Sequence, residues 1–180
     1  GPLGMTRGSD PSYFLLWEPL QLTAAPARLS ISDILRNDLS ALSGIKHTSW
    51  AENILAHRRA VAAGFSEALM LNTRGEVSET ATSNIFMVKN HTVITPPLSS
   101  GCLAGVTRAL LINNMPVDVR FAEMAITLDE LLAADEVFLT SSLRLVQPVE
   151  LISDSTFTIP GEMTSRLMAL VHGLVERNDD

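Results

Sequence analysis

The sequence predicts one domain of the mixed α and β class, in which most neighbouring strands pair antiparallel. Short apolar runs follow one another between residues 67 and 95 and are separated only by turn residues, which is typical of antiparallel hairpins. Helical patterns lie on both sides of this region. The 180 residues, of which 46% are hydrophobic, are enough for one sizeable core.

The N-terminal part of the chain predicts two strands, a loop and a helix. Residues 1–4 read as the remnant of a cleaved tag, with Met5 as the natural start. Apolar or alternating runs at 13–19 and 28–32 predict strands, and residues 33–45 are loop-like. A helix is expected from Trp50 to Gly64, with a core face formed by Trp50, Ile54, Leu55 and Val61.

The middle of the chain predicts a meander of four strands. Each run is rich in apolar and β-branched residues, and turn residues such as Thr73-Arg74-Gly75 and Asn90-His91 separate the runs. The expected strands are 67–72, 76–80, 84–89 and 92–95. Pro96-Pro97 ends the meander.

The C-terminal part predicts alternating helices and strands. The expected helices are 105–114, a short one after the capping box Thr127–Glu130, and 162–176. The expected strands are 120–123, a buried one at 136–140, and 146–149. Pro148 lacks a backbone donor, so the last of these strands is expected at a sheet edge.

Composition excludes several classes of function. The formal net charge is −7 and no basic stripe is present, which argues against a nucleic-acid partner. The four histidines are scattered without metal-ligand spacing, and the one cysteine, Cys102, lies in an apolar stretch. No signal peptide and no run of eighteen apolar residues occur, so we expect a cytoplasmic protein with no membrane contact.

Lys46 is the first candidate functional residue. The chain has two lysines, Lys46 and Lys89, and its other eleven basic residues are arginines. Lysine, unlike arginine, loses its proton when desolvated and then forms a Schiff base with a carbonyl. Lys46 lies where a polar loop runs into a helix, which suits a side chain that projects into a cleft. The alternative is an ordinary solvated lysine.

Three further features follow Lys46 along the chain. Glu79 lies in a strand and is either an exposed carboxylate or one held against a protonated ring nitrogen. Gly105-Val106-Thr107-Arg108 brings amides, a hydroxyl and a guanidinium to a helix start, where anions bind. Thr140-Ser141-Ser142 adds hydroxyls after a buried strand. Together these features indicate the binding groups for pyridoxal phosphate.

The motifs resemble those of the class IV aminotransferases, also called fold-type IV pyridoxal-phosphate enzymes. This family includes branched-chain aminotransferase, D-amino acid aminotransferase and 4-amino-4-deoxychorismate lyase. The matching stretches are Gly44–His47, Glu79 with Asn84–Phe86, Leu103–Arg108, and Val137–Ser142 with Pro148-Val149. The resemblance implies a fold like the C-terminal large domain of that family, a pseudo-barrel of mostly antiparallel strands with flanking helices.

The resemblance also implies roles for individual residues. Lys46 would form the internal aldimine with pyridoxal 5'-phosphate and then act as general base, and Glu79 would keep the ring nitrogen protonated. The phosphate would be held by Val106, Thr107 and Ser142, and Thr82 would pack beside the ring. The backbone of Ser142 and Leu143 would face the substrate carboxylate. Trp50 stands where several members place a tyrosine.

The expected domain organisation follows from the same resemblance. Residues 1–4 are tag, residues 5–40 would be the remnant of an N-terminal domain hairpin with its linker, and residues 41–180 the cofactor-binding large domain. Most of the family's N-terminal domain is then missing. The expected activity is transamination of an amino acid or the related deoxychorismate lyase reaction, in a homodimer. The alternatives are a truncated domain without catalytic competence and an unrelated acidic binding module.

Overall fold

The structure is a computed structural model that describes residues 15–17 and 25–176. Its strands are β1 (Ala27–Ile31), β2 (Glu67–Leu71), β3 (Val77–Thr80), β4 (Asn84–Lys89), β5 (Thr92–Thr95), β6 (Arg120–Glu123), β7 (Glu136–Ser141), β8 (Leu145–Ile152) and β9 (Ser155–Thr156). Its helices are α1 (Ala51–Ala62), α2 (Val106–Asn113), α3 (Leu128–Leu132) and α4 (Glu162–Glu176), with one 3₁₀ turn, η1 (Leu98–Ser100).

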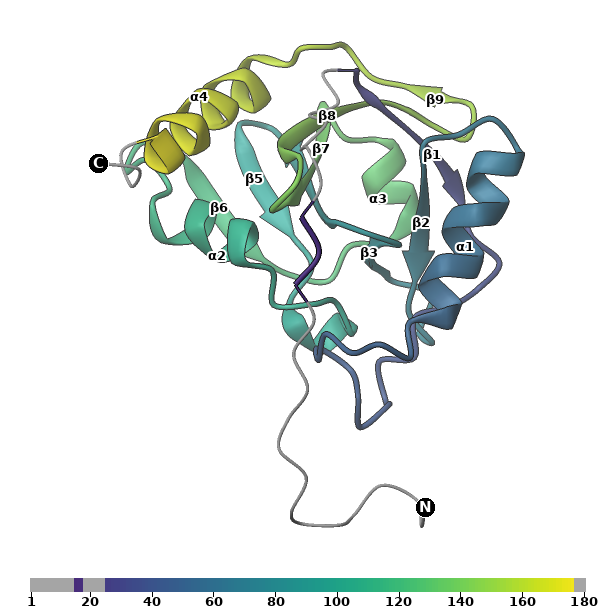
Figure 1. The fold of residues 1–180 in the computed structure, drawn as a ribbon. Helices are drawn as coiled ribbons and strands as arrows, with labels where there is room; N and C mark the ends of the chain where they lie inside the picture. The colour runs from purple at the N-terminus through teal and green to yellow at the C-terminus, as the bar shows by residue number, and fades with distance from the viewer. Residues whose placement is uncertain (1–14, 18–24, 177–180) are drawn as a thin grey trace, which may run out of the picture.

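Within the described residues, nine strands form one curled sheet with helices around it (Figure 1). The strand order is β3-β2-β1-β8-β7-β4-β5-β6, and β9 pairs with β8 beside this path. Strand β1 runs parallel to both of its neighbours, and β5 runs parallel to β6. The remaining pairs are antiparallel. The predicted fold of mostly antiparallel strands with flanking helices is confirmed.

Both faces of the sheet are covered, which explains why its strands read as continuous apolar runs. Along β4, Ile85 and Met87 belong to the core on the inner face, together with Leu131 of α3. Phe86 and Val88, between them in the sequence, belong to a second core that Leu111 of α2 and the buried side of α4 complete. This alternation is the period of two that a pleated strand imposes. Helix α1 covers a third, smaller cluster on β2.

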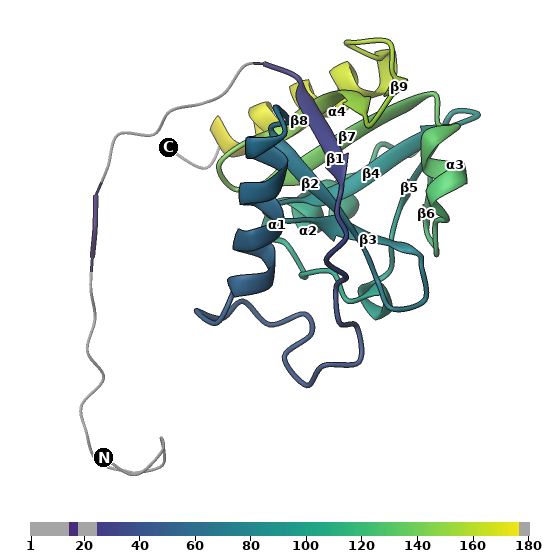
Figure 2. The same ribbon diagram turned by 90° about the vertical axis from the view of Figure 1, so that its right-hand side faces the viewer.

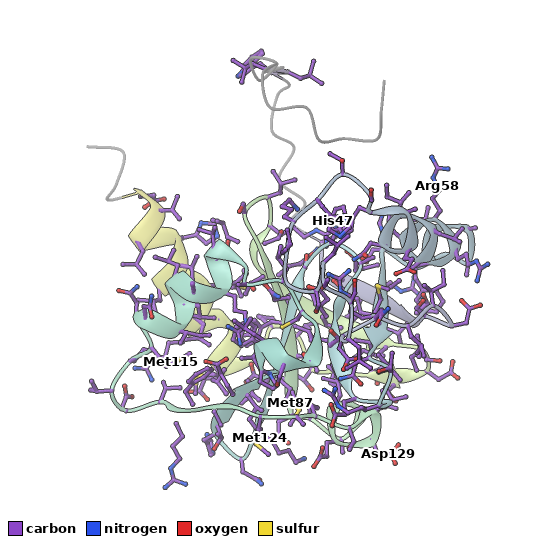
Figure 3. The ribbon with its side chains drawn as sticks, turned by 90° about the horizontal axis from the view of Figure 1, so that it is seen from below. His47, Arg58, Met87, Met115, Met124 and Asp129 are labelled. Atoms are coloured by element: carbon purple, nitrogen blue, oxygen red, sulfur yellow. The ribbon has the colours of Figure 1, made fainter. Side chains whose placement is uncertain are left out.

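The orientation predicted for α1 is wrong. Ile54, Leu55 and Val61, expected in the core, are each about half exposed, at 48%, 46% and 53%. The helix instead turns its small residues Ala56 and Ala60 toward β2, where alanine lets the helix approach closely. Figure 2 shows α1 standing along one side of the sheet. Arg58, in the same helix, points away from the molecule (Figure 3).

The predicted edge position of residues 146–149 is also wrong. They belong to β8, which lies between β1 and β7 near the middle of the sheet. Pro148 lies opposite Phe138 in the register with β7. On its other side, the pairing of β8 with β1 starts only at Val149, one residue after the proline. The missing donor of Pro148 therefore falls where β1 has not yet begun.

Other local predictions are confirmed. Thr127 and Glu130 form the reciprocal capping box at the start of α3. Helix α1 is followed by Gly64 at φ +85°, a left-handed conformation that glycine adopts without steric cost. The strand predicted at 13–19 differs: its residues 15–17 belong to no strand and have exposed side chains, and its other residues lie outside the described part of the chain.

Candidate active site

A cavity of about 290 Å³ collects residues from four distant parts of the chain. Its wall is formed by Lys46 and Trp50, by the end of β3 and the turn into β4 (79–84), by the segment 103–107 that leads into α2, and by the end of β7 (140–142). These are the four stretches that the sequence marks as candidates, and the fold brings them to one place. Of the predicted site residues, Leu143 is outside this wall and is 65% exposed.

Lys46 projects from the loop before α1 into the cavity. Its Nζ lies 4.4 Å from the centroid of the Trp50 ring, within the range of a cation–π interaction. Trp50 precedes the first turn of α1, so the start of the helix fixes the position of the ring. The indole thus forms the side of the cavity against which the lysine chain rests.

Glu79 is the buried acid of the site. Glu79 is 5% exposed, so the alternative of an exposed glutamate in a strand is wrong. Oε2 accepts a hydrogen bond from the Leu103 amide at 2.9 Å, and Oε1 lies 3.2 Å from Nε of Arg36. Burial raises the pKa of Glu79 to about 7, although the Leu103 hydrogen bond and the charges of Arg36 and Lys46 lower it. The carboxylate therefore depends on its cationic neighbours to stay ionised near neutral pH.

Arg36 supports Glu79 from behind and was not predicted. The guanidinium donates to the Gly101 carbonyl at 3.0 Å and to Asn53 Oδ1 at 3.1 Å. Asn53 in turn donates to the Ala81 carbonyl at 3.0 Å. Arg36 lies in a segment read only as a loop, and its local sequence carries no signal of burial. The partners of its side chain, Glu79, Asn53 and Gly101, come from three separate segments, so only the folded chain shows its role.

The start of α2 opens into the cavity. Val106 and Thr107 line the wall, and the cap residue Gly105 makes no side-chain capping bond. The first amides of a helix have no partner within it, so this end attracts anions. A Cβ at Gly105 would lie 2.1 Å from Oδ1 of Asn84, so only glycine permits this approach.

Arg108 differs from the expectation that its guanidinium would join this anion site. The side chain is 6% exposed and turns away from the cavity. It donates to the Pro96 carbonyl at 3.0 Å and to Glu123 at 2.5 Å. The anion-binding groups at this end of the cavity are therefore amides and hydroxyls.

Hydroxyl groups complete the wall at the end of β7. Thr140, Ser141 and Ser142 all line the cavity, as their clustering suggested. The hydroxyl of Thr140 is buried and makes no hydrogen bond within the described residues. Thr82 also lines the wall and donates its hydroxyl to the buried Glu67. An unpartnered buried hydroxyl in a cavity wall is what a polar ligand would satisfy.

The site thus combines an amine, a buried carboxylate and an anion-binding end. No group of three or more His, Cys, Asp or Glu side chains that could hold a metal ion occurs in the described ranges. No helix among the same residues is long and apolar enough to span a membrane. The cavity places the amine of Lys46, a group that acts as nucleophile or base when unprotonated, in the same wall as the buried Glu79.

Comparison with known proteins places the chain among related sequences. A family model described as amino-transferase class IV matches residues 1–152. The aminodeoxychorismate lyase of Vibrio harveyi is 34% identical over 165 residues, which cover 88% of the chain and 58% of that protein. A probable branched-chain-amino-acid aminotransferase of Thermotoga maritima is 35% identical over 144 residues, or 78% of the chain and 52% of that protein. The chain thus spans just over half the length of these relatives.

A solved structure supports the same relationship. The branched-chain aminotransferase of Thermoproteus uzoniensis, solved with norvaline, superposes with a TM-score of 0.80 at 29% identity. The match covers 86% of the chain and 52% of that structure. Because the family model covers most of the sequence and the fold superposes closely on a member, the chain belongs to the class IV aminotransferase family.

Proposed function

We propose that the cavity binds pyridoxal 5'-phosphate and that the chain acts through it on an amino acid. The observation that carries this proposal is the convergence of Lys46, Glu79 and the start of α2 on one cavity. These groups match the three reactive parts of the cofactor, which are an aldehyde, a ring nitrogen and a phosphate.

The residues present fit the cofactor chemically. The cavity volume of about 290 Å³ is close to the lower end of the usual range for small-molecule sites, roughly 300–1,000 Å³. Glu79 is buried and charged neighbours favour its ionised form, as a partner of a protonated ring nitrogen requires. The uncapped start of α2 and the unpartnered Thr140 hydroxyl provide donors for an anion.

Each residue has a distinct task in this proposal. Pyridoxal phosphate supplies an aldehyde that bonds to amines and a ring that withdraws electrons from the substrate α-carbon. Lys46 Nζ would bind that aldehyde and, when free, would accept the α-proton of the amino acid. Glu79 would accept the hydrogen bond of the ring N–H. Val106, Thr107 and Ser142 would hold the phosphate.

The substrate side is assigned to the turn after β7 and to the indole. The backbone of Ser142 and Leu143 faces the substrate carboxylate, Trp50 forms a wall, and Thr82 packs beside the ring. Relatives named as a lyase and as an aminotransferase are similarly close to the chain. Both reactions begin with the same proton removal by Lys46, so the proposal covers both.

The test is to add pyridoxal phosphate, reduce with borohydride and map the modified lysine by mass spectrometry. We expect a visible absorption band and an adduct on Lys46. The variant Lys46→Ala should lose both and keep its melting temperature. Lys89→Ala is the matched control, because Lys89 pairs with Asp135 outside the cavity and should not affect the adduct.

Failure to modify Lys46 specifically would support the alternative of a domain without catalytic competence. An adduct spread over Lys89 and the N-terminus, or no stable adduct, would mean a domain with the family's fold and no competent site. A band that persists in Lys46→Ala would remove Lys46 from the proposal.

A further inference from the structure

Behind one wall of the cavity lies a fully buried carboxylate that the proposed chemistry does not use. Glu67, at the start of β2, is 0% exposed. Its Oε1 accepts from the Ala68 amide at 3.0 Å and lies 3.4 Å from Nδ1 of His57. Its Oε2 accepts from Arg144 at 3.0 Å and from the Thr82 hydroxyl. A buried carboxylate is costly unless paired, and Arg144 is the permanent cation of this group.

Arg144 connects Glu67 to the turn between β7 and β8. Its Nη1 donates both to Glu67 and to the Ser83 hydroxyl, at 3.0 Å and 3.1 Å. Its backbone amide donates to Oγ of Ser141 at 3.2 Å. Ser141 and Leu145 are register partners, so residues 142–144 form the whole turn. One side chain therefore ties this turn to β2 and to the turn between β3 and β4.

The first residue after the turn, Leu145 of β8, has a backbone conformation that needs such support. Leu145 has φ +53°, the left-handed region, which a residue with a branched side chain enters at a cost of about 1–3 kcal/mol. Such a residue persists when its surroundings determine it from several sides. Leu145 packs against the core of α2 and α4 on one side, and Arg144 anchors the turn on the other.

The same turn presents hydroxyls to the cavity. Ser141 and Ser142, where β7 passes into the turn, line the wall, and so do Thr82 and Ser83, which lead into the neighbouring strand β4. Arg144 and Glu67 are not in the wall, so they contact the lining residues without contacting a ligand in it. Movement of the turn would displace Ser142 directly.

We propose that Arg144 is a positioning residue that, through Glu67 and Ser83, holds the β7–β8 turn so that Ser142 binds the phosphate of the cofactor. This inference rests on the proposed function. It predicts that Arg144 affects the phosphate end of the ligand and not the aldehyde end, which Lys46 binds from a different segment.

The experiment compares two ligands that differ only in the phosphate, pyridoxal 5'-phosphate and pyridoxal. Dissociation constants of both are measured for the unmodified chain and for Arg144→Met, Arg144→Lys and Ser83→Ala. Arg166→Met is the matched control, because Arg166 of α4 pairs with the exposed Asp118 and neither residue lines the cavity. Melting temperatures are recorded for every variant.

We expect Arg144→Met to weaken binding of pyridoxal phosphate about tenfold or more, the size of one lost charged hydrogen bond, while pyridoxal binding stays within about twofold. Arg144→Lys should restore part of the preference for the phosphate. Ser83→Ala, which removes one contact and keeps the ion pair, should show a smaller loss in the same direction. Arg166→Met should leave both constants unchanged.

Two results separate the failure of this inference from that of the proposed function. If the unmodified chain binds neither ligand at Lys46, the proposed function fails. If it binds both, and Arg144→Met and Ser83→Ala weaken both ligands equally or neither, the positioning role is wrong. A variant that melts at a lower temperature with an unchanged ratio of the two constants would show that the ion pair serves stability alone.

Discussion

Glu79 is the side chain whose charge state most directly depends on its surroundings. It is buried beside one buried cation, Arg36, and shares the wall of an open cavity with one lysine, Lys46. Burial is the largest influence on its pKa and raises it to about 7. The same acid in the unfolded chain ionises near 4.5. Ionisation of Glu79 therefore lowers the free energy of unfolding.

This difference predicts a pH dependence of stability. Between about pH 4.5 and 7 the unfolded chain releases the Glu79 proton while the folded chain keeps it, so stability should fall as pH rises. The slope contributed by Glu79 is at most about 1.4 kcal/mol per pH unit. Denaturant unfolding of Glu79→Gln at several pH values should lack this contribution.

The difference in unfolding free energy between the unmodified chain and Glu79→Gln should fall from pH 5 to 7 and level off above. The control is Glu52→Gln, an exposed position in the first turn of α1. If the unfolding free energies of Glu79→Gln and the unmodified chain change in parallel with pH across this range, the raised pKa of Glu79 is wrong.

The packing of α1 predicts where the helix tolerates larger side chains. Ala60 is 1% exposed against β2, and Ala62 is exposed two residues later. Ala60→Leu should destabilise the protein by about 1–3 kcal/mol, because the added methyl groups have no space. Ala62→Leu, with the same chemical change, should stay within about 0.5 kcal/mol. Denaturant midpoints measure both, and equal effects would mean that another face of the helix is covered.

The capping box of α3 predicts a loss at the helix end. Thr127 accepts a hydrogen bond from the Glu130 amide at 3.2 Å, and the Glu130 carboxylate accepts from the Thr127 amide at 2.8 Å. Thr127→Ala should cost about 1 kcal/mol by leaving an amide of the first turn unpaired. Thermal unfolding measures this loss. The control Thr158→Ala, at an exposed position outside the helices and strands, should change little.

Over the whole molecule, the exposed apolar side of α1 predicts self-association. Ile54 and Val61 leave about half of their surface in contact with water on the outer side of this helix. Apolar surface of this kind marks sites of protein contact. Sedimentation of the unmodified chain should show association that increases with concentration, and the double variant Ile54→Lys, Val61→Lys should remain monomeric.

Val117→Lys is the matched control for added charge. Val117 is fully exposed in the loop between α2 and β6. Figure 1 shows α2 and β6 on the opposite side of the molecule from α1. Its replacement should not change the association. A chain that sediments as a monomer at all concentrations would contradict the prediction.

The candidate site could be recognised in part from residue order. The chemical groups of a few residues suit only a small number of tasks, and each stands in a short motif that the sequence shows directly; these residues are Lys46, Glu79, Thr107 and Ser142. Arg36, Glu67 and Arg144 support these groups and could not be found in this way. Each is buried or half-buried through contacts across 30 or more positions in the chain, such as Arg144 with Glu67.

The linear pattern of residues settled the class of fold, the hairpins β2–β3 and β4–β5, the last helix and the cap of α3, because these depend on neighbours within a few positions. The continuous meander predicted from β2 to β5 is wrong, because β3 lies at the end of the strand order and β4 lies between β7 and β5. The face of α1 that is buried, the central position of β8 and the partners of Glu79 were decided by the tertiary structure. Period and composition identify apolar residues on an element, but burial depends on which distant segment packs against it. Ala60 is covered and Val61 is not because β2 meets the helix on the side of its alanines.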